Sequence, residues 1–322
     1  MSVLRILNAE PENYSAEAAS VLATLGEVVN GPMQRAELMA ALPQVDVLIV
    51  RLGHQVDRQV LDSAGCLKVI GSATTGLDHI DLEAAHSRGI AVLSLRGETE
   101  FLRTVPATAE HTWALLLALV RHIPAASQSV RSGHWDRDRF RGHDLAGRTI
   151  GILGLGRIGE RVAAYANAFD MKVSAYDPER KIWPANVERM QTQSELLARS
   201  QILSIHVPLN PSTQSLIGAS ELERLPRGAF LINTSRGQVI DEAALLRALE
   251  SGHLAGAALD VLSEERSHSL MASPLIRYAQ DHANLLITPH IGGATYESMA
   301  MTEIFMAKRL KEFLEKSGTN TK

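Results

Sequence analysis

The chain has 322 residues, of which 45% are hydrophobic and 21% are charged, and its formal net charge is −4 at pH 7. The length suits about two domains, and the composition is typical of a soluble globular protein. The small negative charge gives no reason to expect a nucleic acid or an anionic membrane as partner. One cysteine, Cys66, cannot form an internal disulfide, and no signal peptide is visible, so a cytoplasmic location is expected. Cys66 adjoins a predicted strand and is expected to be buried. The longest apolar run, 113–120, is too short to cross a bilayer.

The first hundred residues alternate short apolar strands with helical segments. Strands are predicted at 3–7, 45–50, 67–71 and 90–93, and helices at 15–24, 34–41, 57–63 and 81–87. This alternation indicates a parallel sheet covered on both faces. The stretch 71–81 is rich in small residues and follows a strand, where an open α/β sheet presents its ligand site; the alternative is a plain turn in which Asp81 caps the next helix.

The middle of the chain changes character. Residues 104–122 predict a long helix that is apolar over most of its circumference, which is typical of a helix buried between domains or subunits. Residues 121–145 then mix proline, glycine and alternating charges. Trp135 and Phe140 in this polar stretch predict packing against a partner surface such as a second subunit.

A glycine-rich turn joins a strand to a helix at Gly154-Leu-Gly156-Arg-Ile-Gly159. In a dinucleotide-binding fold the first glycine permits the tight turn, the second lets the backbone approach a pyrophosphate, and the third lets the helix pack on the strand. The helix N-terminus then offers free N–H groups to the phosphates. The alternative is an ordinary strand–helix turn, but the strand and helix on either side favour nucleotide binding.

An acidic residue follows at the expected distance. The strand 172–176 ends in Asp177, about 20 residues after the glycines, where a carboxylate accepts hydrogen bonds from the adenosine ribose and repels a 2′-phosphate. The sequence therefore favours NAD over NADP, although Arg180 and Lys181 lie close by. A polar strand end before Pro178 is the alternative for Asp177.

The second half of the chain repeats the alternating pattern. Its strands are predicted at 150–153, 172–176, 202–206, 229–233, 256–259 and 285–288, and an amphipathic helix at 295–316 most simply returns to the first domain. We therefore expect an α/β protein with two doubly wound parallel-sheet domains. A Rossmann NAD-binding domain, residues 102–289, is inserted into a flavodoxin-like substrate domain, residues 1–101 and 290–322.

Three polar clusters at strand ends of the second series could perform chemistry. Arg236 offers a two-pronged clamp for a carboxylate, and His290, between Pro289 and two glycines, suits a proton donor. The third cluster consists of the carboxylates Asp260, Glu264 and Glu265. Each cluster also has a structural explanation, respectively a surface arginine, a histidine with a backbone partner, and solvated carboxylates.

Together these clusters predict a mechanism. A carboxylate within reach of His290 would favour the imidazolium and orient the ring. The histidine would then protonate a carbonyl oxygen as the nicotinamide delivers hydride, while Arg236 holds the substrate carboxylate. The histidines lack metal-ligand spacing, so no metal site is predicted.

With these motifs the sequence resembles the NAD-dependent D-isomer-specific 2-hydroxyacid dehydrogenases, the family that includes D-3-phosphoglycerate dehydrogenase and hydroxypyruvate reductases. The resemblance covers nearly the whole chain. It rests on Gly154-Leu-Gly-Arg-Ile-Gly159, His206-Val-Pro-Leu-Asn210, Ile232-Asn-Thr-Ser-Arg-Gly237, Ala258-Leu-Asp-Val261 with Glu265, and Pro289-His-Ile-Gly-Gly-Ala294. It implies that Arg236, Glu265 and His290 are the catalytic arginine, acid and histidine.

The resemblance also implies where the cofactor and the substrate bind. The implied NAD-binding residues are Thr108, Gly154, Gly156, Arg157, Ile158, Gly159, Asp177, His206, Pro208, Thr213, Thr234, Asp260, Gly292 and Gly293. Thr75 and Gly76 would bind the substrate carboxylate through their N–H groups, and Arg236 is a further substrate-binding residue. Arg51 is positioned to bind an anionic tail such as a phosphate, with a surface arginine as the alternative. The expected partners are a 2-hydroxy or 2-oxo acid and a second copy of the chain in a homodimer.

Two departures and one alternative remain. The family's acid is usually followed by proline, whereas Arg266 follows Glu265 here, so Glu264 stays an alternative, although Glu265 has the usual offset from Asp260. The sequence also ends after one helix, so the regulatory C-terminal domain of many phosphoglycerate dehydrogenases is not expected. The C-terminal-binding corepressors use the same fold as NADH-sensing interaction proteins with little turnover, and they are the alternative function. Formate dehydrogenases are disfavoured, because they pair their histidine with glutamine.

Overall fold

The computed structural model describes residues 3–31, 33–265, 267 and 269–317. The chain divides into two compact units, which we call unit 1 (Met1–Val105 with Ala294–Lys322) and unit 2 (Pro106–Gly293). The chain therefore passes from one unit to the other twice. The two crossing points lie a few residues from the boundaries expected at 101/102 and 289/290.

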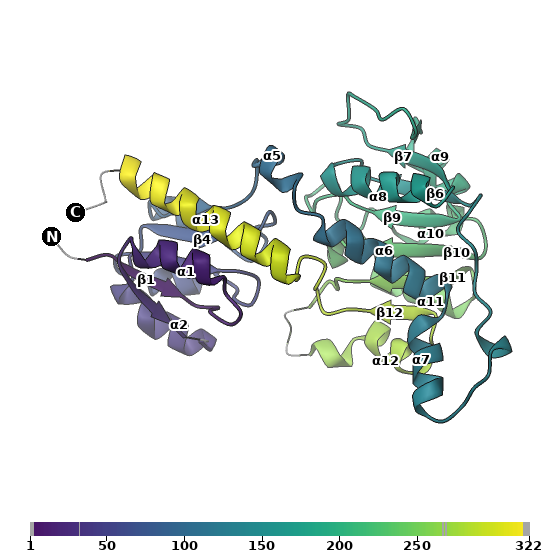
Figure 1. The fold of residues 1–322 in the computed structure, drawn as a ribbon, viewed down its shortest axis with the longest axis horizontal. Coiled ribbons are helices and arrows are strands. Elements are labelled where there is room, and N and C mark those ends of the chain that lie inside the picture. Colours follow the sequence, from purple (N-terminus) through teal and green to yellow (C-terminus); the bar gives the residue numbers. More distant parts are fainter. Residues whose placement is uncertain (1–2, 32, 266, 268, 318–322) are drawn as a thin grey trace. The chain divides into compact units, whose positions relative to one another are not determined.

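Unit 1 is built on a five-stranded parallel sheet with the strand order β2-β1-β3-β4-β5. Its strands are β1 (Arg5–Asn8), β2 (Glu27–Asn30), β3 (Val47–Val50), β4 (Val69–Ser72) and β5 (Ala91–Leu93). One face is covered by α1 (Ala16–Ala23) and α13 (Tyr296–Lys316), which lie side by side in Figure 1. The other face is covered by α2 (Arg35–Ala41), α3 (Arg58–Asp62) and α4 (Leu82–Ser87). The short η1 (Leu42–Gln44) and α5 (Thr99–Leu102) complete the unit.

Unit 2 is built on a seven-stranded parallel sheet with the strand order β12-β11-β10-β9-β6-β7-β8. Its strands are β6 (Thr149–Leu153), β7 (Lys172–Tyr176), β8 (Glu188–Arg189), β9 (Ile202–Ile205), β10 (Ala229–Asn233), β11 (Leu254–Leu259) and β12 (Leu285–Ile287). Its helices are α6 (Ala107–Val120), α7 (Ile123–Arg131), α8 (Arg157–Ala168), α9 (Gln193–Arg199), α10 (Ala219–Arg224), α11 (Glu242–Glu250) and α12 (Pro274–Asp281), with the short turns η2 (Asp138–Phe140), η3 (Gly237–Val239) and η4 (Leu270–Ala272).

The strands of unit 2 bury apolar side chains on both faces. Ile150 and Ile152 of β6 pack with α6 and α8, whereas Leu153 belongs to the cluster that α9, α10, α11 and α12 cover. The same division in unit 1 makes both sheets doubly wound, which confirms the predicted α/β fold class.

Several elements differ from the sequence prediction. Both missed strands, β2 and β8, are edge strands without a buried residue, so they lack the apolar signal by which strands are recognised. The helix expected at 104–122 begins only at Ala107, after Pro106, and its apolar residues belong to the core of unit 2. The expectation that Cys66 is buried is wrong, since this residue is exposed in the turn before β4.

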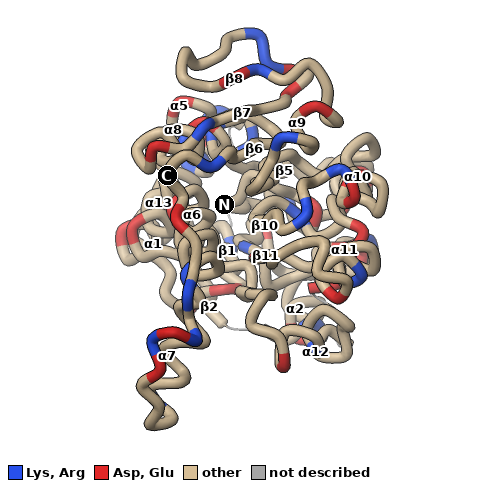
Figure 2. Tube along the Cα trace, turned by 90° about the vertical axis from the view of Figure 1, so that its right-hand side faces the viewer, with Lys and Arg blue, Asp and Glu red and all other residues tan. Residues whose placement is uncertain are grey.

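A protruding segment follows α6. No residue of α7 is buried, and the loop after it carries Trp135 with 89% of its surface exposed. Figure 2 shows positive and negative residues alternating along this segment. Among the described residues, none of the helices combines the length and apolar composition that a bilayer span requires.

Candidate active site

The glycine turn after β6 has a backbone geometry that only glycine allows and that fits a bound pyrophosphate. Gly154 has a φ of +90°, and a Cβ atom there would lie 2.8 Å from the His206 carbonyl group, so only glycine suits the position. A Cβ atom on Gly159 would lie 2.3 Å from the Gly154 oxygen, which keeps α8 close to the strand. Gly156 caps α8 without a side chain and faces open space, which leaves the first N–H groups of the helix accessible.

Positive charge gathers at the same helix end. Arg157 is the first residue of α8, and burial together with the nearby Arg161 lowers the pKa of its guanidinium. A guanidinium in such surroundings is stabilised by an added anion. The turn, the accessible N–H groups and these charges together fit the pyrophosphate of a dinucleotide.

Asp177 lies beside this turn at the end of β7. Its carboxylate accepts hydrogen bonds from the N–H groups of Leu155, at 2.8 Å, and Glu179, at 3.0 Å. Arg180 donates to the Leu155 carbonyl oxygen at 3.0 Å and is ion-paired with Glu160 on α8. The acid is therefore anchored to the glycine turn, while the nearby arginine already has an anionic partner.

Arg236 follows β10, at the carboxyl edge of the sheet. It is half-buried, and its guanidinium donates to the Ser235 carbonyl oxygen at 2.7 Å. Gly237 comes next, and a Cβ atom there would lie 2.0 Å from the carbonyl carbon of Leu262. This close approach holds Arg236 against the loop that follows β11.

The same loop carries the predicted acid. Ser263 is fixed at both backbone groups, because its N–H donates to Glu242 at 2.6 Å and its carbonyl oxygen accepts from Gln238 at 2.7 Å. Two residues later, Oε1 of Glu265 lies 2.8 Å from Nδ1 of His290. Glu264 is exposed, so the carboxylate that meets the histidine is that of Glu265.

The pairing defines the proton positions on the histidine ring. An ionised carboxylate only accepts hydrogen bonds, so Nδ1 of His290 carries a proton and donates it to Glu265. The side chains are about one-fifth exposed, 21% for His290 and 22% for Glu265. The pair thus orients the ring and leaves Nε2 as the atom for a ligand.

A buried carboxylate organises the segment around His290. Oδ1 of Asp260 accepts from Thr288 at 2.6 Å, from the Ile291 N–H at 2.9 Å and from Nε2 of His111 at 3.2 Å. Its Oδ2 accepts from the Gly292 N–H at 2.7 Å. Burial alone would raise the pKa of Asp260, but these hydrogen bonds outweigh it and lower the pKa. The ionised carboxylate therefore shapes the turn that presents His290.

His111 on α6 was not singled out from the sequence. Its ring also lies 3.0 Å from the Thr288 hydroxyl group. A lone histidine in an Ala- and Leu-rich helix carries no signal beyond its polarity, because its partner is almost 150 residues away. The polar side chain in an otherwise apolar helix was the signal in the sequence that could have identified His111.

Other predicted cofactor residues lie at the carboxyl ends of β9 and β10 or on α6. Thr234 shares a 2.8 Å hydrogen bond with Thr112, which in turn donates to the carbonyl oxygen of Thr108. Thr213 donates to the Pro208 carbonyl oxygen at 2.6 Å and closes the turn after β9. Gly293 follows Gly292 and faces open space.

His206 lies behind the glycine turn. Its Nε2 is 2.8 Å from the Ser204 hydroxyl group, and burial lowers its pKa from 6.5 to about 3. The ring is therefore neutral at physiological pH. It cannot be the group whose protonation changes across that range.

The predicted substrate residues Thr75, Gly76 and Arg51 belong to unit 1. Thr74 donates to the Gly76 carbonyl oxygen at 2.8 Å and contacts Ser72, which shapes the loop after β4. Among the described residues, none accepts a hydrogen bond from the N–H groups of Thr75 or Gly76, so these donors suit a carboxylate. Asp81 caps α4 at the end of the same segment, so the loop and the cap coexist.

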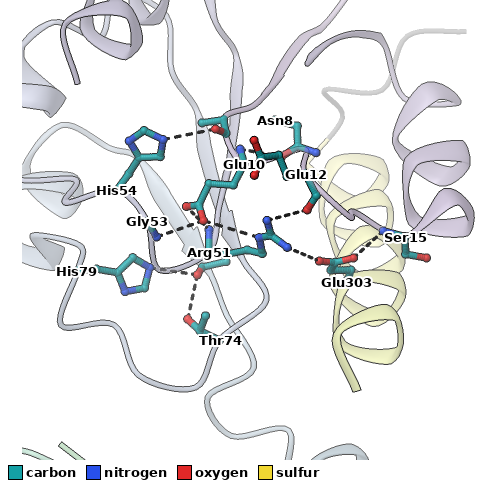
Figure 3. A network of polar contacts seen from close by, with 12 residues as sticks. Asn8, Glu10, Glu12, Ser15, Arg51, Gly53, His54, Thr74, His79 and Glu303 are labelled. Carbon is teal, nitrogen blue, oxygen red and sulfur yellow. Dashed lines mark hydrogen bonds and ion pairs between the residues drawn. The ribbon is translucent and has the colours of Figure 1, made fainter. Parts of the chain in front are cut away.

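Arg51 lies after the neighbouring strand, β3. Figure 3 shows its guanidinium group between the carboxylates of Glu10 and Glu303.

In the described part of the chain, no group of three or more histidine, cysteine, aspartate or glutamate side chains is arranged to hold a metal ion.

The chain is similar to several known proteins in sequence and in structure. A D-3-phosphoglycerate dehydrogenase of Methanocaldococcus jannaschii is 37% identical over 316 residues, which cover 97% of this chain and 58% of that protein. The chain thus spans about half the length of the curated relatives it matches. The crystal structure of the TT0316 protein from Thermus thermophilus superposes with a TM-score of 0.84 at 36% identity and covers 97% of each chain.

A third relative was solved with ligands. The D-lactate dehydrogenase from Aquifex aeolicus, complexed with NAD and lactic acid, superposes with a TM-score of 0.79 at 26% identity, covering 98% of this chain and 97% of that one. The family model for the NAD binding domain of D-isomer specific 2-hydroxyacid dehydrogenases matches residues 113–292, more than half of the chain and within unit 2. The match confirms the resemblance that the motifs indicated. The chain therefore belongs to the D-isomer specific 2-hydroxyacid dehydrogenase family.

Proposed function

We propose that this protein interconverts a D-2-hydroxy acid and its 2-oxo acid with NAD as the redox partner. The observation that carries the proposal is the 2.8 Å hydrogen bond between Glu265 and Nδ1 of His290, with Arg236 on the adjoining loop. An acid–base pair beside an arginine is what reduction of an oxo acid requires. When bound, the nicotinamide supplies or accepts the hydride.

The proposed roles follow from the chemistry of the side chains. Arg236 binds the substrate carboxylate and polarises the carbonyl group. The Nε2 atom of His290 protonates the carbonyl oxygen during reduction and removes that proton during oxidation. Glu265 holds the ring and balances the charge of the imidazolium. The N–H groups of Thr75 and Gly76, in unit 1, bind the substrate carboxylate.

The test is NADH oxidation, followed by absorbance, against a panel of 2-oxo acids that includes glyoxylate, hydroxypyruvate and branched-chain oxo acids. We expect one preferred substrate, and His290→Asn should lower kcat by about 10²–10⁴-fold while NADH binding, measured by fluorescence, stays unchanged. NADH binding without oxidation of any oxo acid would contradict the proposal and favour an NADH-sensing interaction protein.

We propose NAD rather than NADP as the cofactor. The Asp177 carboxylate beside the glycine turn repels a 2′-phosphate, and Arg180 is already paired with Glu160. Asp177→Asn should therefore raise the ratio of kcat/KM for NADPH to that for NADH by about tenfold, the effect of removing one nearby like charge. Glu179→Gln, which alters an exposed neighbouring carboxylate, is the control. An unchanged ratio in Asp177→Asn would refute this role.

A further inference from the structure

At the end of β3 in unit 1, three donors surround the carboxylate of Glu10. The Arg51 N–H donates to Oε1 of Glu10 at 2.8 Å, and the Gly53 N–H donates to Oε2 at 3.1 Å (Figure 3). Nε of Arg51 lies 3.7 Å from the same Oε2. Two alternate backbone N–H groups and a guanidinium are a recurrent arrangement for binding carboxylate or phosphate. We call these three donors the anion cradle.

The remaining donors of Arg51 are also engaged. Nη1 donates to Oε1 of Glu303 at 3.3 Å, and Nη2 donates to the carbonyl oxygen of Glu12 at 3.0 Å. Glu303 comes from α13 and is 1% exposed, and its other oxygen accepts the Ser15 N–H at 2.7 Å. Each guanidinium nitrogen of Arg51 therefore faces an oxygen of the chain, and the side chain is only 19% exposed.

The charges around Arg51 leave no excess of positive charge. One guanidinium faces two carboxylates. Burial raises the pKa of Glu303, against the lowering effect of its hydrogen bonds to Ser15 and Arg51. If Glu303 is ionised the three groups are net negative, and if it is protonated they are neutral. Burial and Glu303 also raise the pKa of the neighbouring Tyr14, whose phenol therefore stays uncharged.

The anion cradle lies at the same sheet edge as the proposed carboxylate-binding loop. Val50 of β3 is in register with Ser72 of β4, so Arg51 and Ala73 leave the sheet side by side, and Thr74 follows one residue later. Neighbouring strands are about 5 Å apart, so a substrate whose carboxylate rests on Thr75 and Gly76 has its tail within a few atoms of Arg51.

We propose that Glu10 is a built-in anion that fills the cradle and thereby selects 2-oxo acids whose tail carries no second negative charge. A phosphate or carboxylate on the tail would meet Glu10 in the place where it needs a free guanidinium. This inference rests on the proposed function. It differs from the expectation, drawn from the sequence, that Arg51 binds an anionic tail of the substrate.

The test uses two substrates that differ by one phosphate group, hydroxypyruvate and phosphohydroxypyruvate. We expect the wild-type protein to have the higher kcat/KM for hydroxypyruvate. Glu10→Gln keeps the size and an acceptor oxygen but removes the charge, and Glu10→Ala empties the cradle. Both should shift the ratio of kcat/KM toward phosphohydroxypyruvate by about tenfold or more, the effect of removing one charge near a bound phosphate.

Two further variants isolate the cradle. Glu12→Gln removes a charge from the same segment, but Glu12 is exposed and contacts Arg51 only through its backbone, so the wild-type ratio should persist. In the double variant Glu10→Ala with Arg51→Ala, the gain for phosphohydroxypyruvate should disappear. A wild-type preference for phosphohydroxypyruvate, or equal ratios in Glu10→Gln and Glu12→Gln, would overturn the inference and leave the proposed function standing.

Anion binding is measured separately from turnover. Inorganic phosphate should raise the melting temperature of Glu10→Ala more than that of the wild type or of the double variant. If no oxo acid is reduced, the proposed function fails, and this measurement alone decides whether the cradle exists. Equal stabilisation of all three proteins would show that it does not.

Discussion

His290 adopts a backbone conformation that few side chains tolerate. Its φ is +55°, in the left-handed region, which costs a residue other than glycine on the order of 1 kcal/mol. The His290 N–H donates to the carbonyl oxygens of Asp260, at 2.8 Å, and Thr288, at 3.0 Å, and the Asp260 carboxylate holds the following N–H groups. The unfavourable conformation is thus held by its neighbours, and it aims the ring at Glu265.

The choice between Glu264 and Glu265 is also made at the level of single residues. Both carboxylates follow the same strand, and their spacing differs by one position, so the sequence left both open. Anchoring of Ser263 by Glu242 and Gln238 sets the direction of the loop, which brings Glu265 to His290 and leaves Glu264 exposed. Those contacts join residues from η3, α11 and the β11 loop, which no local pattern reveals.

This arrangement predicts a loss of rate for Glu265→Gln. In the proposed reaction, reduction requires the imidazolium of His290, and the neutral amide no longer stabilises that charge. The rate of reduction should therefore drop about tenfold or more. The measurement is kcat for oxo-acid reduction at neutral pH.

Glu264→Gln is the matched control, because it removes an equal charge one position earlier and should keep the wild-type kcat. Equal kcat values for Glu265→Gln and the wild type would refute the assigned role of Glu265.

At the level of elements, the candidate active site depends on close approaches between backbone segments. Gly159 brings α8 against β6, and Gly237 brings η3 against the loop after β11. The first was predicted, because the glycine pattern of a dinucleotide-binding turn is local in sequence. The second was not, since Leu262, the residue that Gly237 approaches, follows a different strand and the distance between them is a property of the assembled sheet.

Gly237→Ala should disturb the loop that carries Glu265. The new Cβ atom would lie 2.0 Å from the Leu262 carbonyl carbon and 2.2 Å from the Ser263 nitrogen, both backbone atoms that cannot rotate away. We expect a loss of about 1–3 kcal/mol in the free energy of unfolding and a larger proportional loss in kcat than in NADH affinity. Chemical denaturation and steady-state kinetics measure the two effects.

Gly218→Ala provides the comparison. It lies in the same unit with an ordinary φ of −101°, and the nearest atom to its Cβ would be the flexible carboxylate of Glu221 at 3.4 Å. This variant should keep both stability and kcat near wild-type values. If Gly237→Ala also keeps the wild-type stability and kcat, the close approach at Gly237 matters for neither.

For the whole molecule, the protruding segment of unit 2 supports the homodimer expected from the sequence. Three apolar side chains are largely exposed there, with exposed fractions of 55% for Ile123, 51% for Val130 and 89% for Trp135. Apolar groups gathered on one exposed segment are typical of an interface. We propose that a second copy of the chain covers them.

Trp135→Arg should weaken such a dimer. Placing a charge at the centre of an apolar interface costs several kcal/mol, so we expect the wild type to sediment as a dimer at micromolar concentration and the variant to sediment as a monomer. Ile182→Arg is the control, because Ile182 is also exposed, at 80%, but lies on another loop of unit 2. A monomeric wild type would remove the basis for this prediction.

The sequence alone determined what depends on local periodicity and on short motifs. Apolar alternation identified both parallel sheets, and the spacing of Gly154, Gly156 and Gly159 with Asp177 predicted a nucleotide-binding turn, because each of these signals lies within about 30 residues of chain. The edge strands β2 and β8 carried no such signal, since neither buries a side chain.

The tertiary structure decided everything that depends on which distant segments meet. It paired Glu265 rather than Glu264 with His290, and it placed His111 beside Asp260. It also set Arg51 between Glu10 and Glu303, which come from opposite ends of the chain and change what the arginine can bind. A charged side chain takes its role from the partners that surround it, and those partners are neighbours only after the sheets and α13 have assembled.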